Sequence, residues 1–414
     1  MTNEAVRRVA PVTAPPGCAG DLVRALPTVA AATPNDRVME FWRDHPDQEI
    51  AAVLDAERPV GLLSRQAFME SWAKPFQREL YGRRGCEALM DRHPLVVDVG
   101  DTVSILAARA VSAGARVLRY GFVACCDGRY AGVGTGFAIL EASTAAESAR
   151  AAQLLSNVEY ASIIQRSQLE TSREELSAAW PASAVHWEPR DIVAGDCFLF
   201  RRRPEGLIGA VLDCTGHGVS GAFMTLIGLS VLERALDASG PALPDPGALL
   251  GALNVGVKRA LGQFGAGRAQ SARSDDGLDG AVFVLPAGGD ALSYAGARLP
   301  LLVAGEGPVD VVAGTRVSVG YRATAEGQRW PSERVPLPAS GALVLATDGV
   351  TDQIGGPRSL PFGRRGLTAA VAGASRRGAP AIVDAVVGAL RAWQGAERRR
   401  DDVTLVVLSC GGVA

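Results

Sequence analysis

Four aspartates in the second half of the chain each lie at the end of a short apolar segment, and this pattern constrains the fold more than any other feature. Asp196 opens CFLF, Asp213 closes LIGAVLD, Asp348 follows ALVLAT, and Asp401 lies just before VTLVVL. A single aspartate beside a strand is usually a turn residue, because its side chain bonds the backbone two residues on. Four carboxylates gathered at strand ends repel one another, and burying them unpaired is costly. We therefore predict that bound cations hold them together.

The chemistry of these side chains indicates which cation they bind. Carboxylate oxygens without a Cys/His cluster favour Mg²⁺ or Mn²⁺ over zinc. Two such ions about 3.5–4 Å apart can lower the pKa of a shared water and clamp the attacking and leaving oxygens of a phosphoryl group. In DCTGHG, Asp213 supplies a carboxylate, and the backbone carbonyl of Cys214 can add a ligand within the glycine-rich bend. We predict a centre with two metal ions that acts on phosphoryl groups.

Composition and charge narrow the class of partner. The 414 residues have a formal net charge of -2 and 21% charged residues, which provides no broad field to attract nucleic acid or acidic lipid. The sequence contains no apolar run near the ~18 residues of a membrane span, and its first residues lack the apolar core of a leader peptide. The seven cysteines are odd in number and lack C-x-x-C spacing, which argues against disulfides and favours a reducing compartment. We expect a cytoplasmic protein that binds small molecules or proteins, not nucleic acid or membrane.

The length predicts more than one folding unit, since domains cluster near about 100–150 residues. Residues 1–34 are rich in Pro, Ala, Thr and Gly without periodicity, which predicts a flexible tail. Residues 35–142 alternate apolar strands with helical patterns, as in a small α/β domain. Residues 143–180 lack Pro and Gly and predict a connecting helix, whose apolar stripe is either core or a dimer seam. Residues 181–414 predict β-sheets packed face to face with helices outside them.

The predicted stripe of the connecting helix consists of Leu154, Val158, Ala161 and Ile164, which recur at steps of three and four residues. Three such steps are too few to specify a coiled coil. Both interpretations of this stripe, core and homodimer seam, therefore stay open.

The order of motifs in the C-terminal region resembles the SpoIIE-type branch of the metal-dependent PPM serine/threonine phosphatases. The resemblance covers about residues 160–410, and it rests on WEPRDIVAGD (187–196), DCTGHGVSGA (213–222), DGLDGAV (276–282), YAGARLPL (294–301), TDGVTDQIGG (347–356) and DDVTLVV (401–407). It implies an α+β protein whose C-terminal domain is a PPM-type β-sandwich flanked by helices. It also implies metal-binding roles for Asp196, Asp213, the carbonyl of Cys214, Asp348 and Asp401. EYASIIQRSQL (159–169) resembles the helix that precedes the catalytic domain in that family and can transmit a regulatory signal.

The N-terminal region carries a weaker resemblance. PVGLLSR (59–65) and GRYAGVGT (128–135), with ALMDRHPLVVDVGDTV (88–103) between them, resemble a degenerate pair of CBS motifs. That family of small sensory modules often binds adenine nucleotides, which implies a nucleotide or another small molecule as a ligand. The alternative is an α/β domain that packs or dimerises without any ligand.

The sequence departs from the phosphatase pattern at two positions without losing a ligand. Ala194 stands where the family usually has the first of two glycines, and Glu170 stands where it frequently has proline, so the helix is expected to run on. Cys214 is not expected to be a nucleophile, because a cysteine phosphatase needs a C-x₅-R loop and residue 220 is not arginine.

Four further residues near these motifs have competing interpretations. We interpret His217 as stabilising its loop, although it is also a candidate general acid or ligand. Asp279 is either a further carboxylate of the site or a turn residue. Asp402 is expected to cap or to face solvent while Asp401 binds metal, and Asp352 is expected to shape a substrate-facing flap.

These features lead to one main function and two alternatives. The main hypothesis is hydrolysis of phosphoserine or phosphothreonine in a partner protein by metal-activated water, with the N-terminal domain setting the activity. The resemblance implies that the partner is a phosphorylated STAS-type anti-sigma-factor antagonist in bacterial partner switching. The first alternative is a non-catalytic sensor that only binds a partner. Loss of a metal ligand would indicate such a protein, but none of the expected carboxylates is missing. The second, a nucleotide cyclase or nucleotidyl transferase, lacks a G-x-x-x-x-G-K-[ST] cradle.

Overall fold

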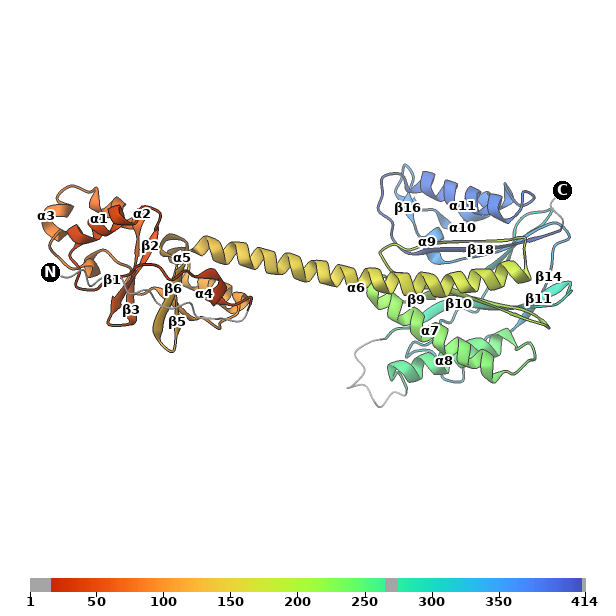
Figure 1. The fold of residues 1–414 in the computed structure, drawn as a ribbon. Coiled ribbons are helices and arrows are strands. Elements are labelled where there is room, and N and C mark those ends of the chain that lie inside the picture. The colour runs from red at the N-terminus through yellow and green to blue at the C-terminus, as the bar shows by residue number, and fades with distance from the viewer. Residues whose placement is uncertain (1–15, 265–274, 412–414) are drawn as a thin grey trace. The chain divides into compact units, whose positions relative to one another are not determined.

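The computed structural model describes residues 16–264 and 275–411 and divides the chain into two compact units, Met1–Leu154 and Leu155–Ala414 (Figure 1). Each unit has its own hydrophobic core. Helix α6, Gly136–Ala179, runs through the boundary between the units.

The first unit contains the element order β-α-β-β-α twice. The first copy comprises β1 (Val29–Ala30), α1 (Asn35–Asp44), β2 (Ile50–Asp55), β3 (Arg58–Ser64) and α2 (Arg65–Trp72). The second copy comprises β4 (Leu95–Asp98), α4 (Val103–Ala113), β5 (Phe122–Cys126), β6 (Arg129–Gly134) and the start of α6, with α5 (Ala115–Tyr120) inserted. Short helices η1 (Ala19–Leu22), α3 (Gln77–Tyr81) and η2 (Cys86–Ala88) complete the unit. In each copy the first strand pairs parallel and the third antiparallel with the second strand.

The two copies match in detail. Each hairpin shifts register at the same point, after the pairs Val53–Gly61 and Ala124–Gly132. The helix after each hairpin is capped in the same way, because Ser64 Oγ accepts from the N–H of residue 67 and Thr135 Oγ1 accepts from that of residue 138. The first unit is therefore an internal repeat that the sequence shows only weakly.

The N-terminal tail is shorter than predicted. Residues 16–34 belong to the first unit, where they form η1 and β1. Ala19 is fully buried and Val29 is 4% exposed. A strand of two residues carries no periodicity, which is why the sequence suggests a tail there; the rest of the predicted tail lies outside the described residues.

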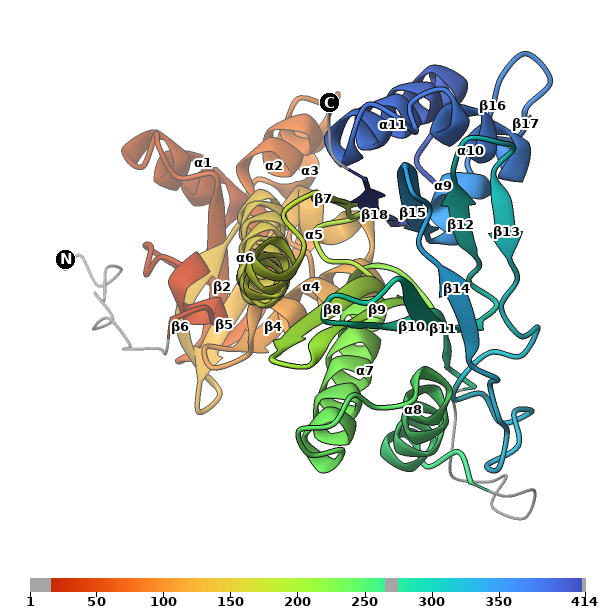
Figure 2. The same ribbon diagram turned by 90° about the vertical axis from the view of Figure 1, so that its right-hand side faces the viewer.

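The second unit is a sandwich of two antiparallel sheets (Figure 2). Sheet I has the order β14-β11-β10-β9-β8 and sheet II the order β13-β12-β15-β18-β7. The strands of sheet I are β8 (Asp196–Arg203), β9 (Gly206–Cys214), β10 (Leu278–Pro286), β11 (Ala291–Ala297) and β14 (Glu333–Pro336). Those of sheet II are β7 (Ser183–Glu188), β12 (Leu301–Ala304), β13 (Asp310–Val312), β15 (Gly341–Ala346) and β18 (Val403–Cys410).

Helices cover the outer faces of both sheets, as Figure 2 shows. Helices α7 (Gly218–Ala238) and α8 (Pro246–Leu261) pack on sheet I, and α10 (Gly363–Ala372) and α11 (Ala379–Gln394) pack on sheet II. Both faces of sheet II are apolar, which explains why helices cover its outer face. In β15, Leu343 and Leu345 face the core between the sheets, while Ala342 and Val344 face α10 and α11. Helix α9 (Asp348–Thr351) packs against α10 and β18, and the small hairpin of β16 (Ile354–Gly355) and β17 (Leu360–Pro361) packs against α11. This arrangement is the predicted sandwich of an α+β protein.

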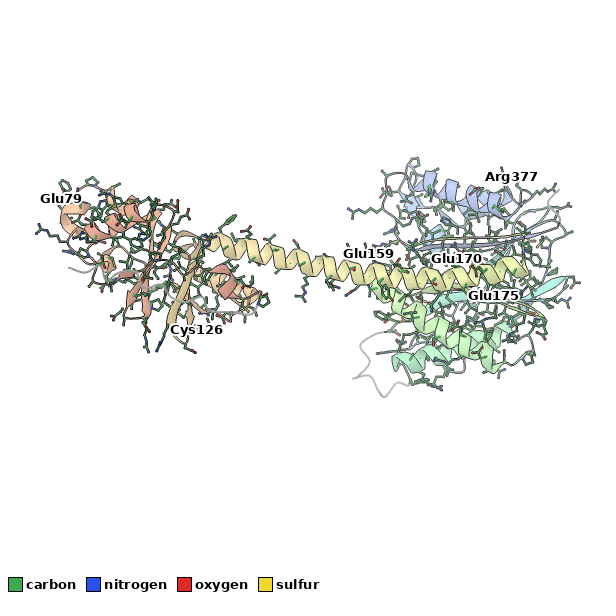
Figure 3. All side chains as sticks on the ribbon, in the orientation of Figure 1. Glu79, Cys126, Glu159, Glu170, Glu175 and Arg377 are labelled. Carbon is green, nitrogen blue, oxygen red and sulfur yellow. The ribbon has the colours of Figure 1, made fainter. Side chains whose placement is uncertain are left out.

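Helix α6 continues through Glu170, as expected from the absence of proline, and ends at Ala179 (Figure 3). Its contact with the second unit differs from the prediction. Leu154 and Ile164 of the predicted stripe are 59% and 45% exposed, whereas a different face of the helix is buried, which consists of Ser162, Gln165, Leu169, Ser172 and Leu176. The predicted stripe is therefore not core of the second unit.

Helix α7 is long and apolar enough to span a membrane by length and composition, and within the described residues no other helix meets both criteria. Its residues Met224, Val231, Leu232 and Leu236 are buried in the core of the sandwich domain. These contacts account for part of its apolar composition, since Val219, Phe223 and Leu226 of the same helix are exposed.

Candidate metal centre

Three aspartates form a row across sheet I. In the strand register, Asp213 of β9 lies opposite Asp196 of β8 on one side and opposite Asp279 of β10 on the other. Side chains of directly opposed residues point to the same face and lie about 4.5–5.5 Å apart at Cβ. Like charges in such positions repel, so this row is stable only if protons or cations neutralise it.

Sheet II contributes the other two predicted carboxylates. Asp348 follows β15 and opens α9, and Asp401 precedes β18, the partner of β15 in the sheet. Across the sandwich, the backbone N–H of Asp348 lies 3.5 Å from Asp213 Oδ2. Residues separated by up to about two hundred positions therefore meet at one end of the sandwich.

Asp196 is the most buried carboxylate of the group, with 2% of its surface exposed. Its Oδ2 accepts hydrogen bonds from Thr347 Oγ1 at 2.6 Å and Thr404 Oγ1 at 2.7 Å. Burial, and then the charges of Asp402 and Asp401, raise the pKa of Asp196 to about 8 despite these hydrogen bonds. The threonines fix the carboxylate in place, but they do not neutralise it.

Asp213 is half-buried and Asp348 is exposed, but the surrounding protein desolvates both carboxyl groups enough to raise their pKa. Burial, followed by the charges of Asp196, Asp348 and Asp401, raises the pKa of Asp213 well above its ordinary value. The pKa of Asp348 rises to about 6, again mainly through burial and then through neighbouring carboxylates. Divalent cations would remove this repulsion, and an all-oxygen donor set suits Mg²⁺ or Mn²⁺. Among the described residues, no three His, Cys, Asp or Glu side chains are already grouped as in a formed metal site.

The glycine-rich bend around Cys214 allows the backbone segments to approach closely. A Cβ on Gly195 would lie 2.3 Å from the carbonyl oxygen of Gly216 and 3.0 Å from that of Cys214. A Cβ on Gly221 would lie 2.7 Å from Cα of Gly195. The Cys214 carbonyl, which the sequence predicts to be a metal ligand, thus lies beside the loop that precedes Asp196.

Of the two roles expected for Asp402, the structure supports capping rather than exposure to solvent. Asp402 is 1% exposed, and its two oxygens accept hydrogen bonds of 2.6 Å from the backbone N–H groups of Arg190 and Gly195. It therefore fixes the loop before Asp196, a capping role deep in the domain. Asp401 is half-buried, and its Oδ1 accepts from the N–H of Asp402 at 2.9 Å.

His217 contacts another side chain of the loop region. Its Nδ1 lies 2.7 Å from Asp191 Oδ2, and the two side chains are 45% and 46% exposed. His217 is also the N-cap residue of α7. This geometry favours the interpretation that His217 stabilises its loop.

A cavity of about 340 Å³ opens beside the carboxylates. Asp213 and Asp348 line it, together with Asp279, Asp352 and two arginines, Arg298 and Arg364. Pro361 and Gly363 form part of its wall. Both belong to the segment 353–366 that follows Asp352, so the predicted flap borders the site. Asp279 is thus a carboxylate of the site, ion-paired through Oδ2 with Nε of Arg298 at 3.1 Å.

Sequence reasoning missed Arg298, the two threonines and Gln165. Gln165 of α6 bonds both backbone groups of Ala194, with its Oε1 accepting at 3.0 Å and its Nε2 donating at 2.9 Å. The same Nε2 lies 3.2 Å from Thr225 Oγ1 of α7. The signal that could have revealed Gln165 is its place in the EYASIIQRSQL motif, four residues before Leu169, which is buried.

Comparison with known proteins adds independent evidence. A family model described as Stage II sporulation protein E (SpoIIE) matches residues 203–411. The SiaA-PP2C domain of Pseudomonas aeruginosa is 29% identical, with a TM-score of 0.55, over 63% of this chain and 99% of that domain. The PP2C phosphatase domain of SpoIIE from Bacillus subtilis, with a fragment of its regulatory domain, is 16% identical, with a TM-score of 0.43, over 56% of this chain and 64% of that one. No curated protein matches the chain. The resemblance of the C-terminal region to the SpoIIE-type phosphatases and the predicted α+β fold are confirmed. The CBS-like character of the N-terminal region stays a prediction.

Proposed function

Because the chain belongs to the SpoIIE family of PP2C-type phosphatases, we propose that it is a metal-dependent serine/threonine protein phosphatase. The observation that carries this proposal is the row of Asp196, Asp213 and Asp279 on sheet I, joined by Asp348 and Asp401 from sheet II. Desolvation and neighbouring carboxylates raise the pKa of Asp196, Asp213 and Asp348, so these groups are poised to exchange protons for cations. The adjoining cavity has room for a phosphorylated side chain.

The proposed ligands of two Mn²⁺ or Mg²⁺ ions are Asp196, Asp213, the carbonyl of Cys214, Asp348 and Asp401. Bound ions of this kind supply an activated water and positive charge for the phosphoryl oxygens. The protein itself supplies orientation, because Thr347 and Thr404 fix Asp196 and Asp402 fixes the loop before it. Preorganised groups of this kind avoid a reorganisation cost when the substrate reacts.

In the proposed reaction a water oxygen bonds to phosphorus while the bond from phosphorus to the serine or threonine oxygen breaks. That oxygen takes up a proton, so the products are a free hydroxyl side chain and inorganic phosphate. No covalent intermediate forms. The Cys214 thiol is unsuited to attack, since a hydrogen bond with Cys197 and then burial raise its pKa well above the ordinary value.

We further propose that the substrate is a phosphorylated STAS-type protein of a bacterial partner-switching system, on the strength of the family resemblance. The repeated β-α-β-β-α order of the first unit supports a CBS-like sensory role with a nucleotide or small-molecule ligand. Exposed Tyr160 and Ile163 on α6 support self-association as a homodimer. We place the protein in the cytoplasm, without a nucleic-acid or membrane partner.

The test is hydrolysis of p-nitrophenyl phosphate by the full chain with Mn²⁺. Asp213→Asn and Asp348→Asn should each abolish the metal-dependent rate while circular dichroism shows an intact fold. Asp290→Asn is the matched control, because it changes a carboxylate that is 87% exposed and ion-paired with Arg334 outside the site. Full activity in both site variants, or a wild-type rate that survives chelation, would overturn the proposal.

A further inference from the structure

Arg298 occupies a fixed place in the turn between β11 and β12. Its φ of 60° lies in the left-handed region, which non-glycine residues rarely adopt. Its backbone N–H donates to the carbonyl of Thr315 at 2.8 Å, and the N–H of Thr315 donates to the carbonyl of Gly296 at 2.7 Å. These backbone hydrogen bonds and the Tyr294 hydroxyl, which donates to the carbonyl of Leu299, maintain this turn, and the Arg298 side chain has no part in them.

The side chain of Arg298 is anchored at one point only. Its Nε lies 3.1 Å from Asp279 Oδ2, and 57% of the side chain is exposed. Among the described residues, its two terminal Nη groups make no hydrogen bond, and Asp279 is its ion-pair partner. Arg298 lines the same cavity as Asp213 and Asp348, so these free donors lie at the wall of the space beside the carboxylates.

The charge balance of the cavity calls for such donors. Four carboxylates line it, those of Asp213, Asp279, Asp348 and Asp352. A phosphorylated side chain brings about -1.5 to -2 further charges at neutral pH. The planar guanidinium group matches a phosphoryl group with two parallel N–H bonds, and it stays protonated next to other cations.

The second arginine of the cavity is placed differently. Arg364 is exposed at the start of α10, just beyond the β16–β17 hairpin, and the described residues contain no ion-pair partner for it. A side chain without an anchor loses more conformational entropy when it is fixed by a ligand. Arg298 is better preorganised because Asp279 already holds its Nε.

We propose that Arg298 binds the phosphoryl group of the substrate through its Nη groups, with Asp279 as the positioning residue that turns the guanidinium toward the cavity. This inference rests on the proposed phosphatase function and specifies which side chain recognises the phosphoryl group. It concerns binding rather than bond making, so it predicts effects on affinity for both substrate and inorganic phosphate.

The experiment compares the wild-type full chain with Arg298→Ala, Arg298→Lys and the matched control Arg334→Ala, which breaks an exposed ion pair elsewhere on sheet I. The readouts are kcat and KM for p-nitrophenyl phosphate, the inhibition constant of inorganic phosphate, and the Mn²⁺ concentration for half-maximal activity. Arg298→Ala should lower kcat/KM and raise the inhibition constant about 10- to 100-fold, as expected for losing hydrogen bonds to a charged group. Arg298→Lys should recover part of the loss, and the Mn²⁺ requirement should not change.

A double-variant cycle tests the role of Asp279. If Asp279 acts through Arg298, Asp279→Asn should weaken phosphate binding in the wild-type background but not in the Arg298→Ala background. Equal effects in both backgrounds would refute the positioning role.

Two outcomes separate this inference from the proposed function. If the wild type hydrolyses the substrate and Arg298→Ala keeps its KM and its phosphate inhibition constant, the inference fails and the phosphatase proposal stands. If the wild type shows no metal-dependent hydrolysis, the phosphatase proposal fails. Calorimetric titration of inorganic phosphate with Mg²⁺ then still tests Arg298, because equal affinity of wild type and Arg298→Ala refutes the binding role. Thermal unfolding checks each variant, and Arg298→Lys serves if the alanine variant does not fold.

Discussion

In the absence of bound metal, this protein should lose stability as the pH rises, which is the reverse of the usual behaviour of aspartates in native proteins. Burial, and then the charges of Asp402 and Asp401, raise the pKa of Asp196 from 3.8 to about 8. The folded state therefore retains a proton that the unfolded chain releases above about pH 4. The stability that this proton confers is fully present below the unfolded pKa and is lost as the pH rises through about 8.

The size of the effect follows from the linkage relation. Between the unfolded and the folded pKa of Asp196, one proton held only by the folded state lowers the free energy of unfolding by about 1.4 kcal/mol for each pH unit of increase. Asp196 alone should thus lower the free energy of unfolding by about 3 kcal/mol between about pH 5 and pH 7. The pKa of Asp348 is raised to about 6, so below that pH the proton on Asp348 makes the free energy of unfolding fall more steeply with pH. Since domains are stable by only about 5–15 kcal/mol, the change is easily measured.

The assay is urea denaturation followed by tryptophan fluorescence, with chelator and with saturating Mn²⁺, across this pH range. The free energy of unfolding of the metal-free wild type should fall as the pH rises. In Asp196→Asn, whose side chain cannot ionise, it should fall less steeply, by the contribution of one proton. Asp290→Asn should keep the wild-type slope. The stabilisation by Mn²⁺ should grow with pH, because cations replace the protons on the ligands. Metal-free stability that is constant or rises between about pH 5 and pH 7 would refute the reasoning.

Two further predictions concern packing and assembly. Gly221→Ala should destabilise the protein by about 1–3 kcal/mol through overpacking and should raise the Mn²⁺ requirement, because its Cβ would lie 2.7 Å from Cα of Gly195. Gly251→Ala in α8 is the control, with no atom within 4 Å of the new Cβ, and it should leave stability unchanged or raise it by about 0.5–1 kcal/mol; equal thermal shifts in the two variants would contradict the packing argument. Replacing Tyr160 and Ile163, which are 66% and 63% exposed, by serine should shift the full chain toward monomer in light scattering, and a wild type that is already monomeric at micromolar concentration would exclude this seam.

The sequence was sufficient to predict the carboxylates because strand ends are strongly marked. The apolar run LIGAVLD ends in an aspartate, and CFLF and VTLVVL each follow one directly. Antiparallel pairing then brings Asp196 opposite Asp213 without further information. The same pairing places Asp279 beside Asp213, an outcome that the sequence left open because DDGLDG also reads as a turn.

The sequence could not reveal contacts that depend on where loops close. Two aspartates stand together at 401 and 402, and nothing in the pair says which one is buried against the N–H groups of Arg190 and Gly195. Arg298 reaches Asp279, nineteen positions earlier in the sequence, only because the β11–β12 turn lies beside β10. Such partners are fixed by topology rather than by local pattern.

The contact between α6 and the sandwich domain explains why periodicity misplaced the packed face of this helix. Leu169 and Leu176 are buried, but so are Ser162, Gln165 and Ser172, which a search for an apolar stripe passes over. Gln165 bonds Ala194, two residues before Asp196, and Ser172 Oγ accepts from the N–H of Phe200 in β8 at 2.6 Å. A helix rotates by about 100° per residue, so a shift of one residue would break both hydrogen bonds and leave buried polar groups unpaired. Hydrogen bonds to the segment that carries Asp196 therefore help to specify the position of α6, and a displacement of this half of the helix would break them.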